Sequence, residues 1–444
     1  MKTEKLVHKL AGTVVIALAS GITGAGLLKL FMEALDYISA KTAAVTAVPG
    51  YLVPLAGAAL AGLIILRRFP GAGGDGTEAY IEAMHNGAES LRGADTIMKI
   101  PATLITLGFY GSGGIVGTLS RISAGMTSAV CRHCIRLFRI KHEETFRIAA
   151  VCGVSAVVSA IFHSPLGGAF FATEITRKNT IIYSDLFPAV LTGCIAVYLS
   201  SLFGQDPIFV AGAPPFGSGI NIILLSAIAG VISGAAGILF IVSYERTGEI
   251  FDSMPFGQPG RALIAGVILA LFWAAGGTDV LGTSIPLFNG LASGDVSFLS
   301  EIPFYSGNIF MLAALLLILK ITATSVTVGS GLSGGVTGPL IIIGACFAAV
   351  FCSVAAIEPG TLNYYAVLCA CTSAILSSAL NIPVAAVLIA VSIFDHSYII
   401  PAALGAILPF FIFRGRTVFA YPGEGPADEF RGNEGITGSG MEDL

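Results

Sequence analysis

Long uncharged apolar runs alternate with short polar connections along most of this 444-residue chain. Residues 207–244 contain no charged side chain, and Glu358 is the only one between Ile321 and Phe394. Both runs exceed the roughly 20 apolar residues that a helix needs to cross a bilayer. Other apolar segments, such as residues 165–176, are shorter than a full span and contain glycine or proline. The pattern predicts an all-α polytopic membrane protein with broken and re-entrant helices.

A short glycine-rich phrase occurs twice, 221 residues apart. Residues 112–118 are Ser-Gly-Gly-Ile-Val-Gly-Thr, and residues 333–339 are Ser-Gly-Gly-Val-Thr-Gly-Pro. With 55 glycines in the chain, chance explains one such match. A second pair argues otherwise, because residues 165–175 and 383–393 both begin with proline, end with isoleucine and lie 218 apart. Two matched signatures in register predict an internal duplication, which in transporters gives inverted halves whose broken helices point at a midplane site.

The duplication divides the chain into two membrane repeats. We expect the first repeat at residues 1–204, a linker at 205–217 and the second repeat at 218–421. A short polar, glycine-rich tail follows at 422–444. Proline and glycine are frequent in the linker, as is usual for a connecting segment.

Charged residues are scarce and indicate topology rather than partners. Hydrophobic residues make up 55% of the chain and charged residues 11%, against about 25% charged in soluble domains. The net charge of −4 says little about partners, since it is spread over short loops. From the apolar composition we expect the lipid bilayer, and no nucleic acid, as a partner. Lys2, Lys5 and Lys9 precede the first apolar segment and place the N-terminus in the cytoplasm. We expect a multi-pass protein of the cell (plasma or inner) membrane with both termini cytoplasmic.

The two glycine phrases also carry the candidate chemistry. A helix that begins near Val116 or Val336 leaves its first backbone amides without intrahelical partners. These N–H groups and the positive end of the helix dipole attract an anion without a full positive charge. We therefore predict an anion site formed by the amides of Ile115, Val116, Gly117, Val336 and Thr337. The alternative for each phrase alone is close helix packing by small residues, which is common in membranes.

Other site chemistries find little support. Neither phrase ends in the Gly-Lys-Ser/Thr of a phosphate-binding loop. Cys131 and Cys134 have the spacing of a metal or redox pair, but no second pair completes a zinc site, so we expect no metal and no other cofactor. The six histidines are dispersed, and no hydrolase-like set of Ser, His and Asp is present. We expect no enzyme activity.

Four segments, in order, resemble the CLC family of chloride channels and proton-coupled chloride transporters. Residues 331–339, Gly-Leu-Ser-Gly-Gly-Val-Thr-Gly-Pro, resemble the family's Gly-Gly-Ile-Phe-Ala-Pro signature. Residues 114–118 stand where the family has Gly-Arg-Glu-Gly-Pro, and residues 74–78 where it has Gly-Ser-Gly-Ile-Pro. Residues 165–175 resemble the family helix that begins Pro-Leu-Ala-Gly and continues to a Glu-Glu pair. The resemblance covers residues 10–420 and implies two inverted halves, a homodimer with one pore per subunit, and a chloride-like anion as substrate.

Two acidic residues of the family are missing here. The glutamate of Gly-Arg-Glu-Gly-Pro is the family's outer gate and proton acceptor, and Val116 stands in its place. The second glutamate of the later pair is the internal proton relay, and here it is Ile175, although Glu174 keeps the first. An aliphatic side chain carries no proton. The resemblance therefore implies passive anion conduction without proton coupling.

Two other departures concern the inner end of the path. Asp75 stands at the position of the family's inner-gate serine, where an ionised carboxylate repels chloride unless it is protonated, turned away or paired with a cation. The family's pore tyrosine corresponds to Phe419 in the best alignment, with Tyr421 as the nearby hydroxyl. Thr337 offers another hydroxyl on the facing helix start. Both aromatic residues also suit interfacial anchoring.

The sequence thus favours passive transmembrane movement of chloride or a similar small anion. Two rival functions stay open. In one, Asp75 is a proton- or cation-linked group of a coupled transporter for another solute. In the other, Val116 shuts the pore, and the protein is a non-conducting membrane sensor or scaffold.

Overall fold

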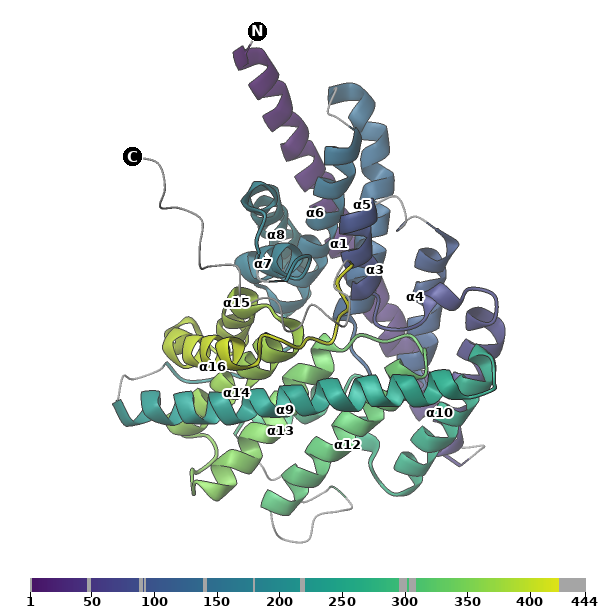
Figure 1. Ribbon diagram of the computed structural model, residues 1–444, viewed down its shortest axis with the longest axis vertical. Helices are drawn as coiled ribbons and strands as arrows, with labels where there is room; N and C mark the ends of the chain where they lie inside the picture. The colour runs from purple at the N-terminus through teal and green to yellow at the C-terminus, as the bar shows by residue number, and fades with distance from the viewer. Residues whose placement is uncertain are drawn as a thin grey trace, which may run out of the picture.

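Helices account for the regular structure of the part of the chain that the structure describes (Figure 1). The structure is a computed structural model, and it describes residues 2–45, 49–87, 91, 93–138, 142–178, 180–215, 220–294, 302 and 309–422. These residues form two isolated β-bridges and no strand. The predicted all-α class is confirmed.

The helices of the first half include long ones and short ones, as the apolar segments indicated. They are α1 (Lys2–Ala43), α2 (Leu52–Leu60), α3 (Thr77–Asn86), α4 (Ala94–Gly108), α5 (Val116–Phe138), α6 (His142–Phe162), α7 (Pro165–Glu174) and α8 (Tyr183–Leu202). A π-helical segment, η1 (Ala61–Leu66), continues α2, and a 3-10 turn, η2 (Pro70–Ala72), precedes α3.

The helices of the second half follow a similar order. They are α9 (Ile220–Ser253), α10 (Gln258–Ala274), α11 (Ile285–Ala292), α12 (Ile309–Gly329), α13 (Thr337–Val354), α14 (Leu362–Leu380), α15 (Pro383–Ile393) and α16 (Ile399–Phe413). Two 3-10 turns, η4 (Thr278–Val280) and η6 (His396–Tyr398), precede α11 and α16.

The membrane character predicted from the apolar runs is confirmed. Eight of the described helices are long and apolar enough to cross a bilayer, namely α1, α6, α8, α9, α12, α13, α14 and α16. By contrast α7 and α15 have only 10 and 11 residues, about half of a full span. Both begin at a proline, Pro165 and Pro383, whose missing N–H is not needed in the first turn. These two short helices, which come from different halves, pack against each other.

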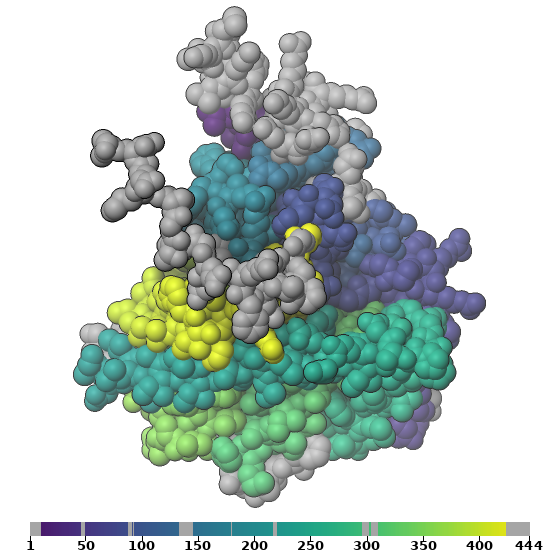
Figure 2. Space-filling view, in the orientation of Figure 1, coloured from purple at the N-terminus to yellow at the C-terminus, as the bar shows by residue number. Residues whose placement is uncertain are grey.

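The two halves occupy different regions of the molecule. In the space-filling view, most of the purple-to-blue residues of the first half lie above the teal-to-yellow residues of the second, although α2 packs against α10 of the second half (Figure 2). The long α9 crosses the front of the second half (Figure 1). The boundaries of the linker and of the C-terminal tail stay predictions, since residues 216–219 and 423–444 lie outside the described residues.

The core is centred on α14, in which every residue from Tyr364 to Leu380 is buried. This helix packs against α9, α13 and α16. Small residues permit the close approach, because a methyl group at Gly405 would lie 2.2 Å from the Ala370 carbonyl oxygen. Close helix packing, the alternative interpretation of glycine clusters, therefore operates between α14 and α16.

Candidate anion site

The two glycine phrases meet, together with the loop before α3. Gly114 and Gly335 exchange two backbone hydrogen bonds of 2.6 Å each and so form an antiparallel bridge. Gly74 pairs with Ser333 in a parallel bridge, and the Gly334 N–H donates to the Gly74 carbonyl over 3.2 Å. Since α3, α5 and α13 each begin two or three residues after one of these glycines, the bridges bring three helix starts from the two halves together.

The carboxylate of Asp75 lies among these helix starts. Its Oδ1 accepts a hydrogen bond from the Thr77 N–H at 2.8 Å, and its Oδ2 accepts one from the Val336 N–H at 2.6 Å. A methyl group at Gly117 would lie 2.2 Å from Oδ1, so the absence of a side chain there leaves the room that the carboxylate fills. The Asp75 side chain is buried. Its carboxylate therefore binds helix-start amides in the manner of an anion.

Two buried hydroxyl groups close to this carboxylate have no hydrogen-bond partner among the described residues. They are Thr77 Oγ1, at the first residue of α3, and Thr337 Oγ1, at the first residue of α13. The Thr77 amide holds Asp75 directly, and the amide before Thr337 holds its other oxygen. A buried polar atom without a partner indicates a place for water, an ion or a ligand. Each hydroxyl thus belongs to a residue that supplies, or directly follows, an amide bound to Asp75.

A buried lysine supports the loop that carries Asp75. Lys99, in α4, donates from Nζ to the carbonyl oxygens of Gly73 and Gly74 at 3.0 and 2.8 Å, and to Ser333 Oγ at 3.2 Å. Its ammonium group also interacts electrostatically with Asp75. The carboxylate is therefore balanced by a cation as well as by amides, which lowers the cost of burying it. The sequence interpretation missed Lys99, although a charge inside an apolar segment of a membrane protein marks a functional position by default.

The two positions that lack the family's glutamates are both buried and aliphatic. Val116 is the first residue of α5, and the first turn of this helix contains no acidic residue. Ile115 precedes it and Gly117 follows it, so the three amides predicted to bind the anion lie at the free N-terminus of α5. Ile175 directly follows the last residue of α7 and is fully buried. Neither Val116 nor Ile175 offers a titratable atom.

The glutamate that is kept, Glu174, binds the start of another helix. Its Oε1 accepts a hydrogen bond from the Val384 N–H at 3.1 Å, and its Oε2 accepts one from the Ala385 N–H at 2.8 Å. Both donors lie in the first turn of α15. A carboxylate at this position satisfies unpaired amides and interacts favourably with the helix dipole. Glu174 therefore ties the end of α7 to the start of α15, its counterpart in the other half.

We expect Glu174→Gln to lower the free energy of unfolding by about 1–2 kcal/mol, because a neutral amide replaces a charged acceptor of two hydrogen bonds. The measurement is thermal unfolding of the purified protein in detergent. Glu358→Gln is the control, since Glu358 is exposed in the loop after α13 and should leave stability unchanged. Equal stability of the Glu174 variant and the parent protein would show that the α7–α15 contact does not depend on this charge.

The two aromatic candidates at the C-terminal end are buried rather than interfacial. Phe419 belongs to the main hydrophobic cluster. Tyr421 donates from its hydroxyl to the Ile175 carbonyl oxygen at 3.3 Å, at the end of α7. The segment that holds them is fixed to α14, since the Val418 N–H donates to the Ala379 carbonyl over 2.9 Å. The role of either ring along the ion path stays a prediction.

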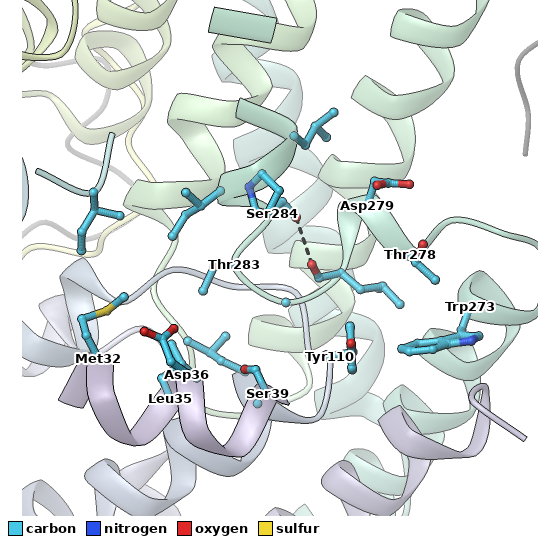
Figure 3. A pocket seen from close by; sticks show the side chains of 18 residues that line it. Met32, Leu35, Asp36, Ser39, Tyr110, Trp273, Thr278, Asp279, Thr283 and Ser284 are labelled. Carbon is cyan, nitrogen blue, oxygen red and sulfur yellow. Dashed lines mark hydrogen bonds between the residues drawn. The ribbon is translucent and has the colours of Figure 1, made fainter. Parts of the chain in front are cut away.

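A cavity of about 730 Å³, which the sequence did not indicate, lies between α1 and the loop before α11 (Figure 3). Asp36 on α1 and Thr283 on the loop line it. The rings of Tyr110 and Trp273, which also line it, meet edge to face with centroids 4.4 Å apart. Gly282 lines the cavity as well, and its carbonyl accepts a 3.1 Å hydrogen bond from the second residue of the first glycine phrase. The cavity therefore reaches the loop that leads to α5.

Solved structures share this architecture. A CLC-type fluoride/proton antiporter superposes with a TM-score of 0.77 at 19% identity, covering 93% of this chain and 97% of the other. A slow cyanobacterial Cl−/H+ antiporter superposes with a TM-score of 0.70 at 18% identity, covering 91% of this chain and 94% of the other. At such identities the likeness establishes the fold, and the predicted architecture is confirmed.

Sequence relatives point the same way. An uncharacterized protein of Methanocaldococcus jannaschii is 26% identical over 78% of this chain and 82% of its own length. A chloride/fluoride channel protein of Pseudomonas syringae pv. tomato is 25% identical over 77% of this chain and 71% of its own. An H(+)/Cl(−) exchange transporter of Vibrio vulnificus is 24% identical over 89% of this chain and 86% of its own length.

The largest part of the chain matches one family profile. Residues 57–414, which include all of α3–α16, match the profile described as the voltage gated chloride channel family. This stretch contains both glycine phrases, Asp75 and Lys99. The chain therefore belongs to the voltage-gated chloride channel (CLC) family.

Proposed function

We propose that this protein moves chloride or a similar small anion passively across the membrane, through the amides at the starts of α5 and α13. The observation that carries the proposal is the placement of the Asp75 carboxylate on the Val336 amide. Amides that hold a carboxylate at 2.6 Å are oriented to hold a free anion in its place. The similar proteins include a chloride/fluoride channel protein and a fluoride/proton antiporter, which agrees with such a substrate.

In this proposal Asp75 is a tethered competitor of the transported anion. Its two oxygens occupy the Thr77 and Val336 amides, so the side chain must leave before an anion binds there. The two unpartnered hydroxyls, Thr77 Oγ1 and Thr337 Oγ1, then become donors to the anion. Conduction requires binding that is strong enough for entry and weak enough for release, and the built-in competitor lowers the occupancy of the site by the free anion.

Proton coupling is not part of the proposal, because the aliphatic Val116 and Ile175 stand where the family has its two proton-carrying glutamates. One observation favours a second candidate function. Asp75 is itself a titratable group on the anion site, and protonation would weaken its hold on the two amides. A transporter that couples anion movement to protons through Asp75 is therefore the alternative, and relatives described as exchangers or antiporters make it worth testing.

The test is flux from liposomes that contain the purified protein and a potassium chloride gradient. We expect chloride efflux that requires a potassium ionophore and leaves the external pH unchanged. Proton movement in a fixed ratio to chloride would instead support coupling through Asp75. Absence of flux with chloride, fluoride, bromide and nitrate would overturn the proposal in favour of a non-conducting sensor or scaffold.

Assembly and location are proposed from family membership. We expect a homodimer with one pore per subunit, in the cell membrane, with both termini in the cytoplasm. Large apolar side chains on the short helices and their neighbours are exposed, including Leu166, Phe187, Val384 and Phe411, and they provide an apolar surface for lipid or for a second copy.

A further inference from the structure

Two fully buried lysines lie in helices at the same position of the two halves. Lys99 lies in α4, the helix before the first glycine phrase, and Lys320 lies in α12, the helix before the second. The two lysines are 221 residues apart, which is also the separation of the two phrases. They are therefore matched residues of the internal duplication.

Each lysine reaches across to the glycine phrase of the other half. Lys99 Nζ donates to Ser333 Oγ at 3.2 Å, and Lys320 Nζ donates to Ser112 Oγ at 3.0 Å. Ser112 and Ser333 are the first residues of the two phrases, so they too are 221 apart. The two contacts are therefore equivalent, as expected for inverted halves related by a pseudo-twofold axis.

Each serine is held a second time by a threonine from the same helix as its lysine. Thr103 Oγ1 lies 2.7 Å from Ser333 Oγ, and Thr324 Oγ1 lies 3.0 Å from Ser112 Oγ. Thr103 and Thr324 are again 221 residues apart. The lysines, the serines and the threonines thus form three matched pairs with the same spacing and the same hydrogen bonds. Such a match argues against a chance placement of either lysine.

Each lysine also holds the loop before a short helix. Lys99 Nζ donates to the Gly74 carbonyl at 2.8 Å, two residues before the N-cap of α3. Lys320 Nζ donates to the Val280 carbonyl at 3.1 Å and to Ser284 Oγ at 2.7 Å, before α11. A buried ammonium group is costly in a membrane protein unless acceptors surround it, and here its acceptors are the loops that set the helix starts.

The two loops differ at one informative position. Gly74 and Gly282 correspond, because both have positive φ and the carbonyl of each accepts a hydrogen bond from the second residue of a glycine phrase, at 3.2 and 3.1 Å. The next residue is Asp75 in the first loop and Thr283 in the second. The carboxylate thus lies beside Lys99, whereas the matching position near Lys320 has a neutral hydroxyl.

We propose that Lys99 and Lys320 are a matched pair of positioning residues for anion transport, an inference that rests on the proposed function. Each fixes the phrase of the other half and the loop before a short helix. Lys99 has a second role that Lys320 lacks, because its charge attracts whichever anion occupies the Val336 amide, whether this is the Asp75 carboxylate or the transported ion.

This second role makes the effect of Lys99 depend on Asp75. While Asp75 is present, the Lys99 ammonium attracts the carboxylate and the free anion alike. Removal of the ammonium therefore weakens both competitors equally and changes the apparent affinity for the free anion little. When Asp75 is replaced by serine, the ammonium attracts the free anion alone. Its removal then weakens anion binding by the full Coulombic contribution of one buried charge.

The test measures the half-saturating concentration and the maximal rate of chloride and fluoride flux in liposomes. In the Asp75→Ser background, Lys99→Met should raise the half-saturating concentration at least about tenfold, the order of effect of one nearby buried charge. In the parent background it should change that concentration less than about threefold, because both competitors lose the same attraction. Lys99→Arg should restore the affinity, since it keeps the charge.

Lys320→Met is the matched comparison, and it should change the half-saturating concentration by the same factor with and without Asp75→Ser. Lys41→Met, at an exposed site on α1, should change nothing. Equal shifts for Lys99→Met in both backgrounds, or no shift in either, would overturn the inference. If Lys99→Met does not yield a monodisperse protein, Lys99→Gln replaces it in the same comparison. Failure of the parent protein to move any anion would refute the proposed function instead, so the two failures are distinguishable.

Discussion

Replacement of Asp75 by serine is expected to raise anion affinity and flux about tenfold to a hundredfold, because hydrogen bonds to a charged group contribute about 1.5–3 kcal/mol. In the parent protein the carboxylate holds the Thr77 and Val336 amides, at 2.8 and 2.6 Å. A serine hydroxyl leaves the Val336 amide free for an anion and removes the repulsion between two negative charges. Lys99 remains in place, so the site also gains a net positive charge.

The measurement is chloride efflux from liposomes as a function of chloride concentration. Asp75→Asn should fall between the parent and Asp75→Ser, because it keeps the shape of the side chain and loses the charge. Asp206→Ser makes the same change in net charge at an exposed position after α8 and should leave flux unchanged. A decrease in flux for Asp75→Ser, with the protein intact, would mean that the carboxylate assists the ion rather than competing with it.

Val116→Glu is expected to reduce anion flux at neutral pH by about tenfold or more, since it places a second carboxylate at the free amides of α5. Val116 is the first residue of that helix and is buried beside the bridge between Gly114 and Gly335. A glutamate there competes with the anion in the way proposed for Asp75. Its ionised form holds the amides and its protonated form releases them, so flux should return as the pH falls.

The corresponding measurement compares chloride efflux of Val116→Glu and Val116→Gln over a range of pH. The glutamine variant has the same size and no titratable group, so we expect it to conduct without this pH dependence. An equal reduction of chloride efflux in both variants would mean that the size of the side chain, and not its charge, causes the effect. Proton movement that accompanies chloride only in Val116→Glu would show that this position alone separates coupled from uncoupled transport.

Much of the fold follows from the sequence because its signals are local. Uncharged runs longer than a bilayer define α9, α13 and α14, and prolines at Pro165 and Pro383 mark where α7 and α15 begin. The repeated glycine phrases indicated that two helix starts meet, and the bridge between Gly114 and Gly335 joins them. Repetition supplied this long-range information, since one glycine cluster alone does not distinguish a helix break from close packing.

The centre of the site was harder to predict because its contacts are non-local. Whether the Asp75 carboxylate turns toward or away from the amides depends on Val336, 261 residues later, and on the space that Gly117 leaves. Lys99 and Lys320 were overlooked because each is the only basic residue in a mostly apolar helix. The 221-residue spacing that pairs them is present in the sequence. Its meaning became apparent only when the structure showed each lysine bound to the serine of the other half.

The most direct test of the anion site is anomalous diffraction from crystals grown in bromide. For Asp75→Ser, we predict a bromide peak within hydrogen-bond distance of the Val336 amide, between the starts of α5 and α13. In the parent protein at the same bromide concentration, the Asp75 carboxylate should occupy that position and the peak should be absent. An Asp75→Ser variant that conducts bromide but shows no peak there, or a parent protein with bromide bound beside an unmoved carboxylate, would contradict the account.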